Sequence, residues 1–359
     1  MTRQTRYFLV GSVLLTSVCL CAGVVAYYSG DLPLGASNAG PEELSYLPAD
    51  TVAVGSANVN EIMNSEFRQR LRQVLPTGQE KDRLQAELGL DIEHDIDRVV
   101  AGVAGATPSL SGALVLVRGR LNATQIEAMA VQHGAKSEEY KGIHLVVADP
   151  VSAAKVAQAT GASASEPFTG AVAFLEPGLI GLGDEASLER GIDAHLSHQD
   201  ATQNADLMRL VADAAAGGNA WAVGRCDALP SIKSLPADVQ TIEDRLAVKW
   251  LSVSARVDHG LSGTVRAEAR DQEAADQLRS VANGALAAGE LMSGQNSRLD
   301  TMLRSLQVTS NGTTVSLAFT VPVEMLDMVN GGAALSKLMQ DHGKGDESPA
   351  PGAPKGIHK

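Results

Sequence analysis

A chain of 359 residues is long enough for two ordinary domains or one large one. Its formal net charge is −13, and the part beyond Tyr28 carries −15, because 27 of the 29 Lys and Arg residues and all 42 Asp and Glu residues lie there. Such an acidic surface repels phosphate backbones and anionic lipid headgroups, which argues against nucleic acid and peripheral lipid surfaces as partners.

The numbers of cysteine and aromatic residues limit the kinds of fold and binding site that the chain can form. Cys226 is the only cysteine beyond Tyr28, so this part of the chain depends on a hydrophobic core and not on disulfides. Eight aromatic residues follow Tyr28, which is too few for a platform that stacks sugars or bases.

The uncharged apolar run Tyr7–Tyr28 predicts a transmembrane helix. At about 1.5 Å of rise per residue it reaches roughly 33 Å, enough to cross a bilayer core of about 30 Å. Tyr7 at one end, and Tyr27 and Tyr28 at the other, match the aromatic belts of membrane interfaces. The membrane is therefore the first predicted partner.

Basic residues predict the orientation of this helix. Arg3 and Arg6 precede the run, and the next basic residue is Arg68, so residues 1–6 are expected in the cytoplasm and the body in the periplasm. The chain is then a single-pass protein of the cell inner membrane. The alternative is a cleaved signal peptide ending near residues 24–26, a small-residue site.

Composition divides the remaining chain. A Gly/Pro/Ser-rich linker is predicted over 29–45, a first lobe over 46–218, a second lobe over 219–342, and a disordered tail over 343–359.

The first lobe reads as strands interrupted by capped helices. The caps are Asn58 with Glu61, Asn122 with Gln125, and Asp184. The expected strands are 51–55, 99–104, 113–118, 143–148, 171–175 and 179–183. The expected helices are 58–75, 80–88, 122–133, one that begins at Asp184, and 206–216, with 152–165 as a weak helix or a loop.

The second lobe contains two strong hairpin signals. One surrounds Asp258-His259-Gly260 and the other surrounds Asn311-Gly312. The expected strands are 220–226, 248–257, 261–269, 306–310 and 314–321, followed by a last helix from Pro322; a long helix from Asp271 is expected to turn Ala274, Leu278, Val281 and Leu286 inward.

The two lobes align with each other. Val52–Asn58 matches Trp221–Asp227, Gly112–Met129 matches Gly263–Leu278, and the hairpin at Glu176 matches the hairpin at Asn311. We therefore predict an α+β fold of two related lobes, each of mostly antiparallel sheet with helices packed on it, preceded by one transmembrane helix. The alternative is that the two lobes are unrelated, because any α+β chain can be aligned with itself in this way.

Two motifs imitate ligand sites. Gly181-Leu-Gly-Asp-Glu-Ala186 has dinucleotide-fingerprint spacing, but Asp184 and Glu185 would face the pyrophosphate, so a turn and a helix cap explain it better. Asp91, Glu93, Asp95 and Asp97 imitate a calcium loop, but Ile96 occupies the position that needs glycine, so a capped helical turn is preferred.

His195 and His198 are the best metal candidates, since histidines three residues apart share a helix face. Asp193 and Asp200 lie nearby, but no HExxH pattern supplies a base, and an exposed helix end is the preferred interpretation. We predict no catalytic, cofactor or metal site and no enzyme activity.

Three segments carry a resemblance: SYLPADTVAVGSANVNEIMNSEFRQRLRQVLP at 45–76, AVAFLEPGLIGLGDEASLERGID at 171–193 and NAWAVGRCDALPS at 219–231. They resemble a family of single-pass bacterial envelope proteins that face the periplasm. The resemblance includes no catalytic motif and implies a location and a fold, not an activity.

Together these observations predict a membrane-anchored binding or scaffold module of the bacterial envelope. Its expected contact with another envelope protein is the groove between the lobes or an edge strand. A lipid or hydrophobic-ligand carrier is the first alternative, and a metal-dependent enzyme using His195 and His198 is the second.

Overall fold

The computed structural model describes residues 40–74, 92–105, 112–132, 134–148, 170–226, 247–293 and 303–322. None of the helices in these ranges has the length and apolar character needed to cross a membrane. The predicted anchor, most of the linker, the helix at 80–88, the stretch at 152–165, the helix beyond Pro322 and the tail lie outside the described residues.

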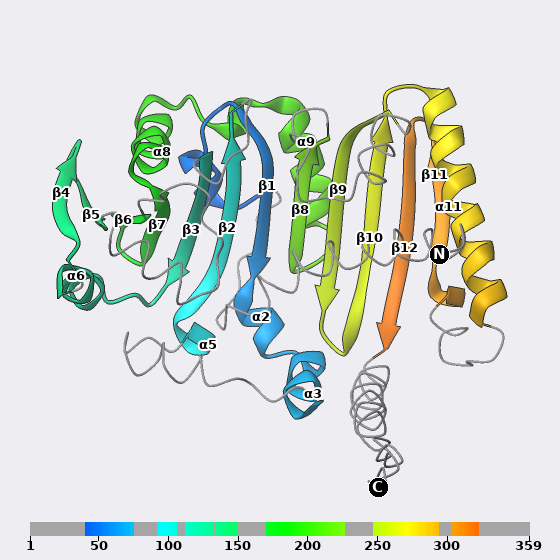
Figure 1. Cartoon of the computed structure of the whole chain (residues 1–359), viewed down its shortest axis with the longest axis horizontal. Helices are drawn as coiled ribbons and strands as arrows, with labels where there is room; N and C mark the ends of the chain where they lie inside the picture. The colour runs from blue at the N-terminus through cyan, green and yellow to red at the C-terminus, as the bar shows by residue number, and fades with distance from the viewer. Residues whose placement is uncertain are drawn as a thin grey trace, which may run out of the picture.

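Twelve antiparallel strands form one continuous sheet (Figure 1). Their order across the sheet is β11-β12-β10-β9-β8-β1-β2-β3-β7-β6-β5-β4. The strands are β1 (Thr51–Asn58), β2 (Ile96–Ala104), β3 (Ala113–Gly119), β4 (Lys136–Tyr140), β5 (Ile143–Val147), β6 (Gly170–Glu176), β7 (Leu179–Asp184), β8 (Ala220–Arg225), β9 (Val248–Val257), β10 (Gly260–Ala269), β11 (Gln307–Asn311) and β12 (Thr314–Pro322).

Helices pack on both faces of this sheet. The predicted caps are confirmed, since the side chains of Asn58, Asn122 and Asp184 each accept a backbone N–H three residues later. The helices are η1 (Glu42–Tyr46), α2 (Val59–Met63), α3 (Glu66–Val74), α5 (Ile92–Asp95), α6 (Ala123–Gln132), α8 (Glu185–Ser197), η3 (Ala201–Gln203), α9 (Ala205–Ala215) and α11 (Gln272–Ser293).

The two predicted lobes share this sheet through β1 and β8. The five registered pairs of this seam run from Ala53 opposite Gly224 to Ala57 opposite Ala220, and they include Val54 opposite Val223. Val54 and Val223 are also partners in the sequence alignment of the two lobes. The seam therefore has the local symmetry of a two-fold axis, which relates each strand to the other.

Strand order outward from the seam is the same on both sides. The first half runs β1-β2-β3-β7-β6 and the second runs β8-β9-β10-β12-β11, with the β4–β5 hairpin as an addition to the first. The common origin of the two lobes and their exact limits remain predictions, and Asp227, which aligns with the Asn58 cap, lies outside the described residues.

Alternation along the strands gives the sheet two faces, named here the α8 face and the α2 face. Val54, Leu116 and Trp221 lie on the α8 face, buried in the main core with residues of η1, α8 and α9. Ala57 and Val117 lie on the α2 face, in a smaller core with residues of α2 and α6. Helix α11 packs over β10, β11 and β12 on the α2 face.

Two helix predictions need correction. The single helix expected over 58–75 is two helices, because α2 ends at Asn64 and Ser65. The Ser65 hydroxyl then accepts the Arg68 N–H in the first turn of α3. In α11, Ala274 is buried as expected, but Val281 is 56% exposed. Val281 lies about two turns beyond Ala274, so the packed face of α11 does not extend to it.

Strand β4 was missed in the sequence. Its five residues, Lys136–Tyr140, have no apolar alternation, because the first four side chains are exposed at the end of the sheet. An edge strand without a buried face leaves no periodic signal.

Candidate functional site

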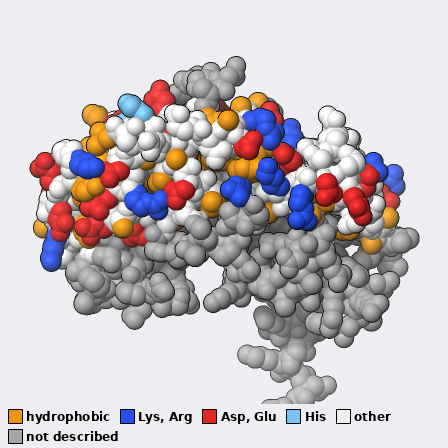
Figure 2. All heavy atoms as spheres, turned by 90° about the horizontal axis from the view of Figure 1, so that it is seen from above, with side chains coloured by type: hydrophobic (Ala, Val, Ile, Leu, Met, Phe, Trp, Pro, Cys, Tyr) orange, Lys and Arg blue, Asp and Glu red, His pale blue; other side chains and the backbone are white. Residues whose placement is uncertain are grey.

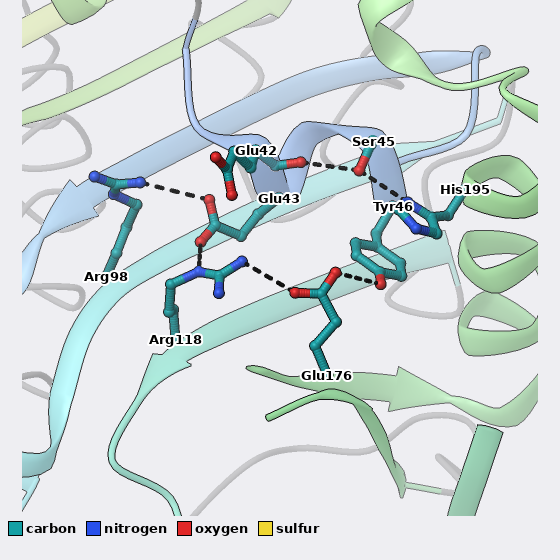
Figure 3. Close-up of polar contacts among 8 residues, drawn as sticks. All are labelled: Glu42, Glu43, Ser45, Tyr46, Arg98, Arg118, Glu176 and His195. Carbon is teal, nitrogen blue, oxygen red and sulfur yellow. Dashed lines mark hydrogen bonds and ion pairs between the residues drawn. The ribbon is translucent and has the colours of Figure 1, made fainter. Parts of the chain in front are cut away.

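A half-buried polar cluster fastens η1 to the α8 face of the sheet (Figure 3). Glu43 and Tyr46 of η1 point toward Arg118 of β3 and Glu176 of β6. In the sequence η1 directly follows the predicted linker, so the cluster joins the start of the folded body to the sheet.

Glu43 is a carboxylate only 1% exposed, held between two arginines. Arg118 Nε donates a hydrogen bond to Glu43 Oε1, and Arg98 Nη1 lies 3.6 Å from Glu43 Oε2. Although burial acts to lower the pKa of Arg118, the hydrogen bond and charge of Glu43 raise it overall. The two guanidinium groups compensate the cost of burying this carboxylate.

Glu176 extends the cluster to Tyr46. The Tyr46 hydroxyl donates a 2.9 Å hydrogen bond to Glu176 Oε1, and Arg118 Nη2 lies 3.7 Å from Glu176 Oε2. Burial, followed by the hydrogen bond and charge of Glu176, raises the pKa of Tyr46 well above its ordinary value. The phenol therefore stays protonated and serves as a fixed donor.

His195, the first metal candidate, belongs to the same cluster. Its ring stacks on Tyr46 with 4.0 Å between ring centroids, and its Nδ1 lies 3.0 Å from Ser45 Oγ. His198 lies beyond the end of α8, in the left-handed conformation with φ 55°. The expected shared helix face is wrong, because the helix ends between the two histidines.

The two nearby acids have other contacts. Asp193 pairs with Lys141 at 2.5 Å and accepts from Tyr140, while Asp200 caps η3 through Thr202. Within the described ranges, no three His, Cys, Asp or Glu side chains are grouped as metal ligands would be. The geometry therefore gives the metal-enzyme alternative no support.

One serine–histidine–carboxylate group escaped the sequence analysis. His144 of β5 contacts Glu127 of α6 at 2.9 Å and Ser137 of β4 at 3.2 Å. Both contacts use Nε2, whereas a catalytic triad needs one ring nitrogen for each partner. The arrangement joins α6 to the β4–β5 hairpin and lacks the geometry of a nucleophile with its base.

The two motif interpretations hold for the described residues. Gly181 and Gly183 lie in β7, an antiparallel strand between β3 and β6, and Asp184 caps α8. A Cβ at Gly181 would meet Leu188 at 2.8 Å, so the glycine lets α8 approach the sheet. In the calcium-like segment, Ile92–Asp95 forms α5 and Ile96 begins β2, while Asp91 lies outside the described residues.

The two ends of the sheet differ in charge. Strand β4 is the outer strand at one end and exposes Lys136, Glu138 and Glu139. Charged side chains on an edge strand hinder the approach of another strand. This end is protected against edge-to-edge pairing.

Strand β11, at the other end, has no charge and no proline. Gln307, Thr309, Ser310 and Asn311 are exposed, and Val308 is partly buried. Among the described residues β11 pairs only with β12. Its outer backbone groups are therefore the candidate binding site, which only the order of strands in the folded sheet could reveal.

In the part of the chain that the structure describes, neither the seam nor the interior offers a comparable site. The seam is a paired ladder of strands and not an open groove. The best-formed hollow in the described part, lined by Leu47, Gly102 and Leu114 among others, has a volume of about 10 Å³. That is room for about one water molecule.

Charges of both signs mix on the upper side of the molecule. In Figure 2, Lys and Arg side chains alternate with Asp and Glu side chains over the coloured surface. This side shows no broad area of one sign, so electrostatic attraction does not single out a binding region on it.

Comparisons with known proteins show a distant fold likeness and no family. No protein family matches the chain, and no curated protein matches it. Among solved structures, one described as crystal form I of TP0453 is similar over 82% of this chain and 99% of that chain, with a TM-score of 0.41 and 7% identity. A likeness this distant does not bear on function, and the predicted envelope family remains a prediction.

Proposed function

We propose that this chain is a membrane-anchored binding or scaffold module of the bacterial envelope, with its body in the periplasm, and that it binds a protein partner along strand β11. The observation that carries the proposal is the contrast between the two edges of the sheet. The edge strand β4 exposes charged side chains, whereas the edge strand β11 is exposed, uncharged and free of proline.

An edge strand is a template for another strand, because its outer N–H and C=O groups face no partner strand. An extended segment of a partner can join such an edge through main-chain hydrogen bonds, with alternate side chains giving specificity. Strand β11 also continues an apolar row, since Val308 lies opposite Leu317 of β12, which lies opposite Val265 of β10.

The lipid-carrier alternative lacks a comparable observation. A carrier needs an internal volume of several hundred Å³ for an acyl chain. In the described part the side chains near the hollow leave about 10 Å³. Side chains also pack closely against glycines, as Leu47 does at Gly102 and Leu114 at Gly191. The helices and the sheet therefore pack there without room for an acyl chain.

Site-specific photo-cross-linking in intact cells tests the proposal. A benzophenone amino acid replaces Thr309 in the full chain, and the matched control replaces Glu138, the central exposed residue of β4. Protein adducts at position 309, at least fivefold above those at position 138, are the expected result. Equal yields at the two positions, or none at 309 in a chain of normal abundance, would exclude β11 as the binding edge.

A further inference from the structure

We infer that the strand added to β11 is β11 of a second copy of this chain, so that two sheets join about a two-fold axis. The inference rests on the proposed function, because it names the partner of the same edge. It also predicts that α11 of each copy lies beside α11 of the other.

The backbone of β11 is suited to this pairing. The β11–β12 hairpin closes through Gly312 and Thr313, with Asn311 opposite Thr314. In a two-residue hairpin the closing pair is hydrogen-bonded, and alternate residues then direct their N–H and C=O groups outward. Those residues are Val308 and Ser310.

An antiparallel pair centred on Thr309 uses both of them. Val308 of one copy then lies opposite Ser310 of the other, and four main-chain hydrogen bonds can form. Gln307 lies opposite Asn311, and the two Thr309 side chains meet at the axis. Thr–Thr pairs are favourable, and none of the five pairs opposes like charges.

In this pairing the side chains of each β11 strand also stay on the same face of the joined sheet as those of the other copy. Val308 and Ser310 lie on the α2 face, while Gln307, Thr309 and Asn311 lie on the α8 face, as their partners in β12 require. An axis perpendicular to the sheet keeps these faces aligned between copies. The chain already joins its own two halves in this manner at Val54 and Val223.

Strand β4 is less suited to pairing with itself about its central residue. An antiparallel pair centred on Glu138 places two carboxylates opposite each other, and like charges at directly opposed positions destabilise a sheet. The register equivalent to the one proposed for β11 is therefore disfavoured at β4.

Helix α11 supplies a second contact region. It lies at the outer end of the sheet, beside β11 (Figure 1). Val281 is one of three large apolar side chains described as exposed, at 56%, and a Cβ at Gly284 would meet no atom within 4 Å. No charged residue occurs from Val281 to Gly289. Stable interfaces bury about 1,200–2,000 Å², more than a short strand pair supplies, so this helix contact completes the interface.

Oxidative cross-linking of the full chain in membranes tests the inference. Thr309→Cys places two thiols at the axis, at the about 4.5 Å Cα separation of a non-hydrogen-bonded pair, which a disulfide can span. We expect a covalent dimer with mild oxidant. Glu138→Cys is the matched control, and the wild-type chain gives the background from Cys19, Cys21 and Cys226.

Substitutions of opposite charge at position 309 test whether the partner is a second copy of this chain. Thr309→Glu opposes two carboxylates, so the dimer fraction in native membranes, measured with a bifunctional lysine cross-linker, should fall about fivefold. Coexpression of Thr309→Glu with Thr309→Lys should restore it as a mixed dimer. Circular dichroism of each variant checks that it folds.

The outcomes separate the two proposals. Disulfide dimers of Thr309→Cys with mixed-dimer rescue support the second copy. Photo-adducts at Thr309 that contain a different protein, with no disulfide dimer, overturn the second copy and leave the binding edge in place. An absence of adducts by both methods overturns both proposals.

Discussion

At the scale of single residues, Glu43 shows how the start of the body is fixed. Its carboxylate is 1% exposed, and Arg98 and Arg118 are about one third exposed, so the cluster lies at the boundary between core and solvent. Removing one member of such a network leaves the others partly desolvated without their partner. The cluster is therefore a stability element with a measurable effect.

Glu43→Gln keeps the shape of the side chain and removes its charge. We expect it to lower the free energy of unfolding by about 2 kcal/mol, since the two arginines lose their buried counter-charge. Denaturant titration of the full chain in detergent measures the change. Glu42→Gln, at the exposed neighbouring position, is the control and should cost less than about 0.5 kcal/mol. Equal losses in the two variants would contradict the role given to Glu43.

The raised pKa of Tyr46 predicts that the free energy of unfolding falls at alkaline pH. Its pKa is raised in the folded chain, so the unfolded chain releases the phenol proton first, at about pH 10. The stabilisation is complete below about pH 10 and is lost as the pH rises through the folded pKa. Tyr46→Phe should therefore flatten the decline in unfolding free energy above about pH 10. A wild-type slope retained by the variant would contradict this assignment.

At the scale of elements, close packing of helices on the sheet depends on glycine at specific positions. A Cβ at Gly191 of α8 would meet Leu114 at 2.7 Å and the Tyr46 carbonyl oxygen at 2.8 Å. A Cβ at Gly284 of α11 would meet open space. The same residue type therefore has opposite roles in the two helices.

Gly191→Ala should lower the free energy of unfolding by about 1–3 kcal/mol, because the added methyl group must displace η1 from α8. Gly284→Ala is the matched variant and should raise it by about 0.5–1 kcal/mol through helix propensity. Thermal unfolding of both variants measures the signs. Stabilisation by Gly191→Ala would show that η1 does not pack against α8 in this way.

At the scale of the whole molecule, the sheet is an open sheet of twelve strands with two unlike ends. Closed barrels have no edges, and open sheets protect theirs by charge, proline or cover. Here strand β4 carries charged side chains, whereas strand β11 carries none and has α11 packed on one face of its end of the sheet. This asymmetry gives the molecule one preferred direction for association.

The predicted membrane topology also belongs to this scale. Ser37→Cys in the linker should react with a membrane-impermeant maleimide in cells opened only at the outer membrane. The wild-type chain controls for Cys226 and for the two cysteines of the predicted anchor. Labelling of position 37 only after rupture of the inner membrane would reverse the orientation expected from Arg3 and Arg6.

The sequence by itself determined the features that depend on neighbouring residues. The Asn58–Glu61 cap, the Asp184 cap and the Asn311-Gly312 hairpin are decided within three or four residues, so their signals are local. Buried strands such as β9 are visible for the same reason, since alternation records burial on one face. These signals predicted eleven of the twelve strands and the α+β class.

Only the tertiary structure decided the features that join distant residues. Glu43 meets Arg118 across 75 positions and Tyr46 meets Glu176 across 130, and no periodic pattern records such pairs. Strand β4 and the exposed Val281 depend on where the sheet ends, and the contrast between β4 and β11 depends on which strands are outermost. Edges exist only in the folded sheet, because a strand becomes an edge when every other strand has found its place.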